Sequence, residues 1–436
     1  MSFPRYPAYK PSGVEWLGEV PEHWQVKRVR RIFEIKKRIA GELGFDILSI
    51  TQQGIKVRDP ESNDGQVSMD YSKYQVVEPG DFAMNHMDLL TGYVDISGRL
   101  GVTSPDYRVF SIAEPNGSHP GYLLNIFQMG YKQKILYAYG QGSSQLGRWR
   151  LPTEEFQDWA IPFPSLEEQA SIGIFLDHET AKIDALIAEQ QRLIELLQEK
   201  RQAVISHAVT KGLNPDAPMK DSGVEWLGEV PVHWVVCNFQ RFVQIAEGQV
   251  DPRQNPYADM PLIAPNHIQA GTGQLLGLET AAEQGAESGK YICNEGDVIY
   301  SKIRPSLRKA CIAPCACLTS ADMYPLRAHG RLSNEFLFRF LLSEQFSALA
   351  IVESERVAMP KINRDSLKSV ALAIPPKLEQ EDICLSIRVH SRTFDALIAE
   401  GQEAIVLLSE RRSALISAAV TGQIDVRGLV LEGEAA

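Results

Sequence analysis

Two long stretches of the chain repeat apolar residues at spacings of three and four, which is the pattern of a helix that packs along one face. The first stretch carries Ile183, Leu186, Ile187, Leu193, Ile194, Leu197, Val204 and Ala208. The second stretch carries Phe394, Leu397, Ile398, Ile405, Leu408, Leu415 and Ala419. Two long helices with matching apolar faces are predicted to pair as an antiparallel coiled coil.

Local signals predict where these helices begin and end. Ser165, with a glutamate three residues later, forms a capping box, so the first helix should begin there. Gly212 should end it, and Gly422 should end the second helix. Arg201 and Arg412 occupy equivalent places in the two stretches, where each could pair with a carboxylate on the other helix or extend into solvent.

A long-period internal repeat indicates the domain organisation. SGVEWLGEVPEHW at residues 12–24 recurs as SGVEWLGEVPVHW at 222–234, an offset of 210. The helical segment from Asp184 recurs in similar form from Asp395, an offset of 211. Between these segments similarity is slight, so the two halves share a frame and differ in the middle. Such a frame can present two different binding surfaces.

The tryptophans of the repeated segment are interpreted as packing anchors, because a stretch shared by both halves is poorly suited to two different targets. They are Trp16, Trp24, Trp226 and Trp234. His23 and His233 also occupy equivalent positions and are interpreted as structural.

The predicted fold class is α/β, with two strand-rich mixed domains separated and followed by the two long helices in a pseudo-twofold duplication. The expected segments are a first domain at 1–165, a first helix at 166–213, a second domain at 214–378, a second helix at 379–425 and a C-terminal tail at 426–436.

The composition of the 436-residue chain, 44% hydrophobic and 23% charged, is typical of globular material. No apolar run approaches the ~20 residues that span a bilayer. The first residues, MSFPRYPAYK, lack the apolar core of a signal peptide. We therefore expect a cytoplasmic protein with reduced cysteines and no membrane contact.

The net charge of −11 is unevenly distributed. The segment 166–213 has 5 basic and 8 acidic residues and 379–436 has 5 and 10, so most of the acidity lies outside the two domains. Within the domains, basic residues cluster locally, which suits either phosphate contact or a solvated charged face. The clusters are Lys27, Arg28, Arg30, Arg31, Lys36, Lys37 and Arg38, and Lys302, Arg304, Arg308 and Lys309.

Catalytic and cofactor-binding motifs are not found in the sequence. Asn255-Pro256-Tyr257 lacks the second proline of a methyltransferase motif, and GAESGK at 285–290 is one residue short of a P-loop. Cys311, Cys315 and Cys317 fit no familiar zinc finger and are better explained as small apolar residues in a strand. The chain is therefore predicted to be non-catalytic, with no metal or cofactor of its own.

The order of segments resembles the specificity subunit of type I restriction-modification enzymes over essentially the whole chain. The resemblance rests on SGVEWLGEVPEHW, on IPFPSLEEQ at 161–169, on the helix IDALIAEQQRLIELLQEKRQAVISHAVTKG and on the repetition of this plan. The second half adds GDVIYSKIRPSLRK at 296–309 and MPKINRDSLKSVALAIPP at 359–376.

The resemblance implies that each domain is a target-recognition domain that reads one half of a bipartite site in double-stranded DNA. The helices would set the unread gap and bind two methyltransferase subunits, and motor-nuclease subunits would complete the restriction complex. S-adenosylmethionine would belong to the methyltransferase, and ATP and Mg to the motor-nuclease. The first half has GDFAMNHMDLLTGYVDIS in place of GDVIYSKIRPSLRK, so the phosphate-facing roles of Lys302 and Arg304 do not transfer to it.

Residues that read bases should be polar, should lie outside the duplicated frame and should occur in loop-rich stretches. In the first domain the candidates are Gln52, Gln53, Lys56, Arg58, Asn85, His86, Ser143, Ser144, Gln145 and Arg148. In the second they are Asn266, His267, Gln269, Ser301, Lys302, Arg304, Arg308, Lys361, Asn363 and Arg364. Two alternatives remain open: a specificity subunit of a modification-only system, and a duplicated coiled-coil adaptor that reads no bases.

Overall fold

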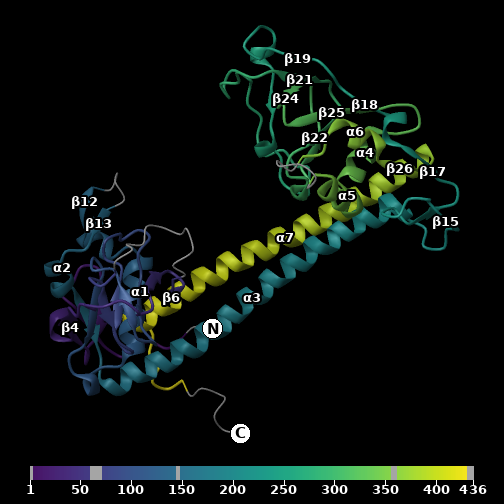
Figure 1. Ribbon diagram of the computed structural model, residues 1–436. Helices are drawn as coiled ribbons and strands as arrows, with labels where there is room; N and C mark the ends of the chain where they lie inside the picture. Colours follow the sequence, from purple (N-terminus) through teal and green to yellow (C-terminus); the bar gives the residue numbers. More distant parts are fainter. Residues whose placement is uncertain (1–2, 59–70, 144–147, 355–360, 430–436) are drawn as a thin grey trace. The chain divides into compact units, whose positions relative to one another are not determined.

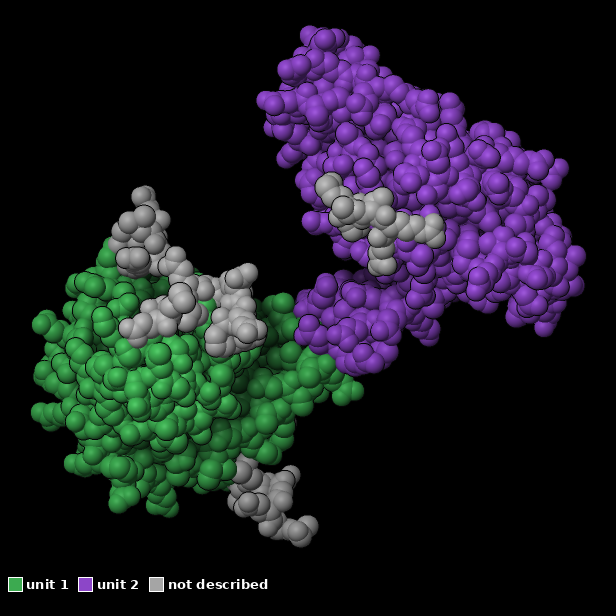
Figure 2. Space-filling view, in the orientation of Figure 1, with its two compact units in different colours: residues 1–189, 404–436 green, residues 190–403 purple. Residues whose placement is uncertain are grey.

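A computed structural model describes residues 3–58, 71–143, 148–354 and 361–429. The chain divides into two compact units (Figure 2), unit 1 formed by 1–189 with 404–436, and unit 2 by 190–403. Each unit contains one strand-rich domain and part of each long helix, α3 (Leu166–Lys211) and α7 (Lys377–Val420), which Figure 1 labels.

Unit 1 is built on a four-stranded antiparallel sheet in the order β4-β11-β8-β9. These strands are β4 (Phe33–Lys36), β8 (Phe82–Met84), β9 (Val94–Ile96) and β11 (Arg108–Ile112). Two-stranded pairs surround it: β1 (Tyr9–Pro11) with β2 (Glu19–Pro21), β3 (Gln25–Arg28) with β14 (Ala160–Phe163), β5 (Leu48–Thr51) with β6 (Gly54–Val57), β7 (Gln75–Val77) with β10 (Gly101–Thr103), and β12 (Gln141–Ser143) with β13 (Arg148–Arg150). Its short helices are α1 (Pro120–Lys132) and α2 (Thr153–Asp158).

Unit 2 contains a sheet in the corresponding order, β18-β25-β22-β23. These strands are β18 (Val243–Ile245), β22 (Val298–Ser301), β23 (Ala310–Ile312) and β25 (Met323–Ala328). A second sheet has the order β19-β21-β24-β20, with β19 (Gln249–Val250), β20 (Leu262–Ile263), β21 (Lys290–Cys293) and β24 (Cys317–Thr319). The remaining pairs are β15 (Met219–Asp221) with β16 (Glu229–Pro231) and β17 (Val235–Asn238) with β26 (Ala371–Ile374), and the short helices are α4 (Asn334–Leu341), α5 (Glu344–Ser354) and α6 (Arg364–Ser369).

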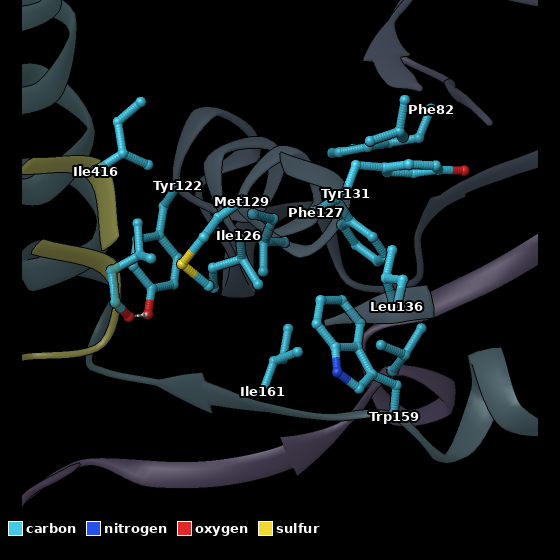
Figure 3. Close-up of a cluster of buried hydrophobic side chains, with 14 of the residues drawn as sticks. Phe82, Tyr122, Ile126, Phe127, Met129, Tyr131, Leu136, Trp159, Ile161 and Ile416 are labelled. Atoms are coloured by element: carbon cyan, nitrogen blue, oxygen red, sulfur yellow. Dashed lines mark hydrogen bonds between the residues drawn. The ribbon is translucent and has the colours of Figure 1, made fainter. Parts of the chain in front are cut away.

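The end of α7 belongs to the core of unit 1. Figure 3 shows Ile416 in one buried cluster with Tyr122, Met129 and Ile126 of α1. The hydroxyl of Tyr122 donates to the carbonyl of Val420 at 3.3 Å. In unit 2 the end of α3 packs into the core in the same way, through Ile205, Ala208 and Val209. Both long helices are therefore held by hydrophobic burial where they meet a domain.

The repeated tryptophan segment is structural, as predicted. Trp24 and Trp234 are fully buried, while Trp16 and Trp226 pack against the same cores. His23 pairs with Glu168 at 3.0 Å, and His233 pairs with Glu379 at 2.7 Å. These contacts tie the start of each domain to the first turn of a long helix. The prediction of packing anchors is confirmed.

The observed helix ends agree closely with the local signals. The Ser165 hydroxyl accepts from the amide of Glu168 at 3.3 Å, and α3 ends before Gly212, whose φ is +79°. The second helix was expected to run to residue 425, but α7 ends at Val420. The reason is Gly422, with φ +77°, after which the amide of Gln423 turns back to donate to the Ala418 carbonyl at 2.8 Å.

Some positions of the predicted apolar faces are wrong, since Leu186, Leu193 and Leu397 are exposed. Of the two possibilities left open for Arg201 and Arg412, the structure shows the contact with a carboxylate on the other helix, close for Arg412 and loose for Arg201. Arg412 contacts Asp184 in unit 1, and Arg201 approaches Asp395 in unit 2.

Two of the three cysteines predicted to lie in a strand do so, whereas Cys315 lies in the bend between β23 and β24. Cys311 lies in β23 and Cys317 in β24, and both are buried. Burial raises the pKa of the Cys311 thiol to about 12, so it stays protonated. Within the described ranges, no group of three or more His, Cys, Asp or Glu side chains is placed to hold a metal. No helix in those ranges combines the length and the apolarity needed to cross a bilayer.

Candidate nucleic-acid interface

Two loops of unit 2 carry several of the predicted reading residues and are joined by hydrogen bonds. One loop follows β20, and the other connects β22 to β23. The Lys309 ammonium donates to the Pro265 carbonyl at 2.6 Å, and the Gly271 amide donates to the Arg308 carbonyl at 3.3 Å. Gly273, with φ +77°, lies where a Cβ would be 2.3 Å from the ring of Phe338. Only glycine fits this close approach.

The β22–β23 loop places two arginines in left-handed backbone conformations. Arg304 and Arg308 both have φ of 47° and flank the short 3-10 turn η8 (Pro305–Leu307). This region is uncommon for a side chain other than glycine, asparagine or aspartate, and it costs on the order of 1–3 kcal/mol per residue. Arg304 is exposed and Arg308 half-buried. The loop thus holds two guanidinium groups at its surface at some expense of stability.

Five of the predicted reading residues in unit 2 instead bind the domain's own backbone. Ser301 is buried and donates to the Ile303 carbonyl at 3.1 Å, so it does not reach the surface. Lys302 donates to the Ala321 carbonyl at 2.7 Å. His267 accepts the Ala264 amide at 3.2 Å, Asn363 caps α6 by accepting the Ser366 amide at 2.7 Å, and Arg364 donates to the Ala246 carbonyl at 2.8 Å. Asn266, Gln269 and Lys361 are exposed.

A cavity of about 370 Å³ in unit 2 brings two predicted readers together with the long helices. Gln269 and Arg308 line it from the domain. Arg201 and Gln202 line it from α3, and Asp395 from α7. The helix residues were missed because the candidates were restricted to positions outside the duplicated frame.

Unit 1 has a corresponding cavity of about 340 Å³. Gln52, at the tip of the β5–β6 hairpin, lines it together with Tyr93, Lys132 and Ser413. Ser413 of α7 is equivalent to Gln202 of α3 at the repeat offset of 211. In both units, therefore, a predicted reader faces a long helix across a small polar cavity.

The other predicted reading residues of unit 1 whose side chains the structure describes do not line this cavity. Gln53 and Lys56 are exposed and hydrogen-bonded to each other, and Arg58 is half-buried. Ser144 and Gln145 lie outside the described residues. Ser143 and Arg148 are paired across the β12–β13 hairpin, which is all that the structure describes of them.

Asn85 and His86 follow β8 in unit 1. Their positions correspond to those of Ser301 and Lys302 at the end of β22 in unit 2. Burial, followed by the charge of Arg108, lowers the pKa of His86 to about 3, so the ring is neutral. His86 accepts the Leu151 amide on its carbonyl, as Lys302 accepts the Ile362 amide, both at 2.9 Å. These residues therefore fix the ends of β8 and β22, where each strand continues into a loop.

The basic cluster of unit 1 is largely neutralised by acidic partners. Arg28 and Arg30 both contact Asp158, at 3.3 and 2.9 Å. Arg38 is bonded to Glu78 and Asp81. This pattern favours a structural role for the cluster over phosphate contact.

The comparisons with known proteins agree with this architecture. Residues 231–405 match the family model described as the type I restriction modification DNA specificity domain. The chain is 27% identical over 285 residues to the type I restriction enzyme EcoDI specificity subunit of Escherichia coli, covering 62% of this chain and 63% of that protein. It is 21% identical over 277 residues to the EcoKI specificity subunit of Escherichia coli, covering 61% and 57%. The matches thus span about three fifths of these relatives' length.

Two solved structures share the fold along most of the chain. One, from work on complex assembly and conformational transition of the type I R-M system, aligns with a TM-score of 0.64 at 16% identity and covers 92% of this chain and 98% of its own. The HsdS subunit from Thermoanaerobacter tengcongensis aligns with a TM-score of 0.50 at 15% identity, covering 93% and 98%. With the matched specificity domain, these findings confirm the resemblance to type I restriction-modification specificity subunits that was drawn from the sequence.

Proposed function

We propose that this chain is the non-catalytic DNA-recognition subunit of a type I restriction-modification complex, in which each domain reads one half of a bipartite site. The observation that carries this proposal is the contrast between frame and loops. The central sheets β4-β11-β8-β9 and β18-β25-β22-β23 have corresponding strand orders. The pairs β1–β2 and β3–β14 also have counterparts in β15–β16 and β17–β26. The other strands differ, since unit 1 has the β5–β6 hairpin and unit 2 the four-stranded β19-β21-β24-β20 sheet. A duplicated frame with two dissimilar surfaces suits two different half-sites.

We propose further that α3 and α7 pair as an antiparallel coiled coil that sets the gap between the half-sites. Between Ile183 and Arg201, the buried and half-buried positions of α3 alternate between steps of four and three. They are Ile183, Ile187, Gln190, Ile194, Leu197 and Arg201.

The two interhelical ion pairs support a single register. From the pair Asp184–Arg412 in unit 1 to Arg201–Asp395 in unit 2, α3 advances by 17 residues and α7 goes back by 17. Equal and opposite steps are what antiparallel pairing requires.

The methyltransferase is proposed to dock on apolar residues that the helices leave exposed. In unit 1 these include Leu186 and Leu407, and in unit 2 Leu193, Leu196 and Leu397. Exposed leucines along helices are typical of a protein interface. Two methyltransferase subunits would supply S-adenosylmethionine and adenine methylation, and motor-nuclease subunits would supply ATP and Mg chemistry. The complex is expected to work in the cytoplasm.

Selection of duplexes from a randomised DNA pool tests the function. The full chain, purified with a co-expressed methyltransferase, should enrich a single motif with two specified halves and an unspecified gap. A modification-only system would give the same motif without DNA cleavage when the neighbouring subunits are added. Enrichment of no motif would contradict the proposal and favour the coiled-coil adaptor.

A further inference from the structure

Arg201 and Arg412 are equivalent in the repeat, but their guanidinium groups are bound differently. In unit 1, Arg412 donates through Nε and Nη2 to both oxygens of Asp184, at 2.8 and 3.1 Å. In unit 2, the Nε of Arg201 is 3.6 Å from Asp395 Oδ1, beyond hydrogen-bond range. Only 12% of the Arg201 side chain is exposed. One arginine is fully paired, and its counterpart is held loosely in a buried position.

The Nε of Arg201 is buried and has no hydrogen-bond partner in the part of the chain that the structure describes. An unpaired buried N–H of a charged group costs on the order of 1–3 kcal/mol or more. Positive charge also accumulates nearby. Burial lowers the pKa of Arg339, and the carboxylate of Glu335 partly opposes that shift. The positive charge of Arg201 lowers the pKa of Arg339 further. This environment favours an additional anion beside Arg201.

The 370 Å³ cavity next to Arg201 has the lining that an anion requires. Arg308 contributes a second guanidinium, which forms no ion pair within the described ranges. Its nitrogens lie about 4 Å from where a Cβ at Gly271 would stand. The amides of Gln198, Gln269 and Gln402 add further donors, and Asp395 is the one acidic group of the lining. Guanidinium groups match the geometry of a phosphate with two parallel N–H bonds.

We propose that Arg201 and Arg308 bind a backbone phosphate of duplex DNA in this cavity, beside the half-site that the second domain reads. The site rests on the proposed function, and it makes the long helix α3 a part of the DNA-binding surface of unit 2. The Asp395 carboxylate contacts Arg201 only loosely, so an incoming phosphate displaces it. In unit 1, Arg412 is already bound by both oxygens of Asp184 and is not free for the same role.

Salt dependence of DNA binding tests the site. The probe is a mixed-sequence duplex titrated with the full chain over a range of KCl concentrations. Arg201→Gln should reduce the slope of log affinity against log salt by about 0.9, the contribution of one phosphate contact. The matched variant Arg412→Gln should keep the wild-type slope. A wild-type slope for Arg201→Gln, or an equal reduction in both variants, would overturn the site.

A second pair of variants decides the question if Arg201→Gln does not fold. Asp395→Asn should raise duplex affinity by roughly threefold, because it removes the group that competes for Arg201. Asp184→Asn removes the same charge from the equivalent position of unit 1 and should leave affinity unchanged. No gain for Asp395→Asn, or the same gain for both, refutes the phosphate site while the proposed function stands. Failure of the wild-type chain to bind any duplex refutes the proposed function itself.

Discussion

Arg412 and Asp184 join the end of α7 to the beginning of α3 by two hydrogen bonds between one guanidinium and one carboxylate. The carboxylate is about half exposed, with 52% of the Asp184 side chain accessible, so solvent screens the pair. We predict that Arg412→Gln lowers the free energy of unfolding by no more than about 1 kcal/mol.

The charge-reversed double variant Asp184→Arg with Arg412→Asp should recover most of that loss, whereas each single reversal should cost more than Arg412→Gln. Urea unfolding followed by circular dichroism measures these differences. If the double variant is less stable than both single reversals, the two side chains do not form the pair described.

Gly273 determines the position of the loop that follows β20. A Cβ at this residue would lie 2.3 Å from Phe338 Cζ and 2.8 Å from the Ala310 carbonyl oxygen, so Gly273→Ala must displace the loop. The variant should weaken recognition of the second half-site by tenfold or more and leave the first half-site unchanged.

Gly271→Ala is the matched control, because Gly271 has a similar φ of +70° but its Cβ would meet no atom closer than 3.9 Å. Competition between duplexes altered in one half at a time measures the effect. Equal losses for the two variants would show that backbone strain, and not the contact with Phe338, is responsible.

Arg304 and Lys302 are close in sequence, but substitutions at them should have different effects, one on base recognition and the other on stability. Arg304 is exposed at the surface of the loop, whereas Lys302 binds the Ala321 carbonyl. Arg304→Ala should lower discrimination in the second half-site by ~1–3 kcal/mol without changing the melting temperature. Lys302→Met should lower the melting temperature and keep the recognised bases.

Methylation mapping and differential scanning fluorimetry together distinguish these outcomes. A loss of stability in Arg304→Ala with unchanged base preference would remove Arg304 as a reader.

His86 makes unit 1 sensitive to acid. Burial lowers its pKa to about 3 from an ordinary value of 6.5, so between these values the unfolded chain binds a proton that the folded chain does not. The stability contributed by neutral His86 is therefore complete above about pH 6.5 and declines as the pH falls towards 3.

His86→Gln should flatten this dependence, because glutamine carries no titratable proton. Urea midpoints measured between pH 7.5 and pH 4.5 report the change. The same decline in wild type and variant would assign the acid sensitivity to other groups.

The repeated frame could be predicted from sequence because its signals are local. The Ser165 cap and the glycines at 212 and 422 act within one turn of the helix, and they predicted the helix ends to within a few residues. The exposed Leu186 and Leu193 were placed in the apolar face because a spacing of three or four does not distinguish the helix contact from its flank.

The candidate site could be predicted only in part. Gln269 and Arg308 do lie together at a cavity. Lys302 and Asn363 instead satisfy backbone groups of their own domain, and nothing in their residue type separates that use from contact with a base. The place of Arg201 at the cavity was missed, because its approach to the β20 loop depends on tertiary packing.

Exchange of one domain tests the central claim most directly. Residues 25–160 are replaced by the corresponding segment of a related specificity subunit that recognises a different sequence, and methylated adenines are mapped in cells that also express the methyltransferase. Independent reading predicts that one half of the bipartite motif changes while the other half and the gap stay as in the wild type. A change in both halves would contradict the account, and so would methylation without any motif.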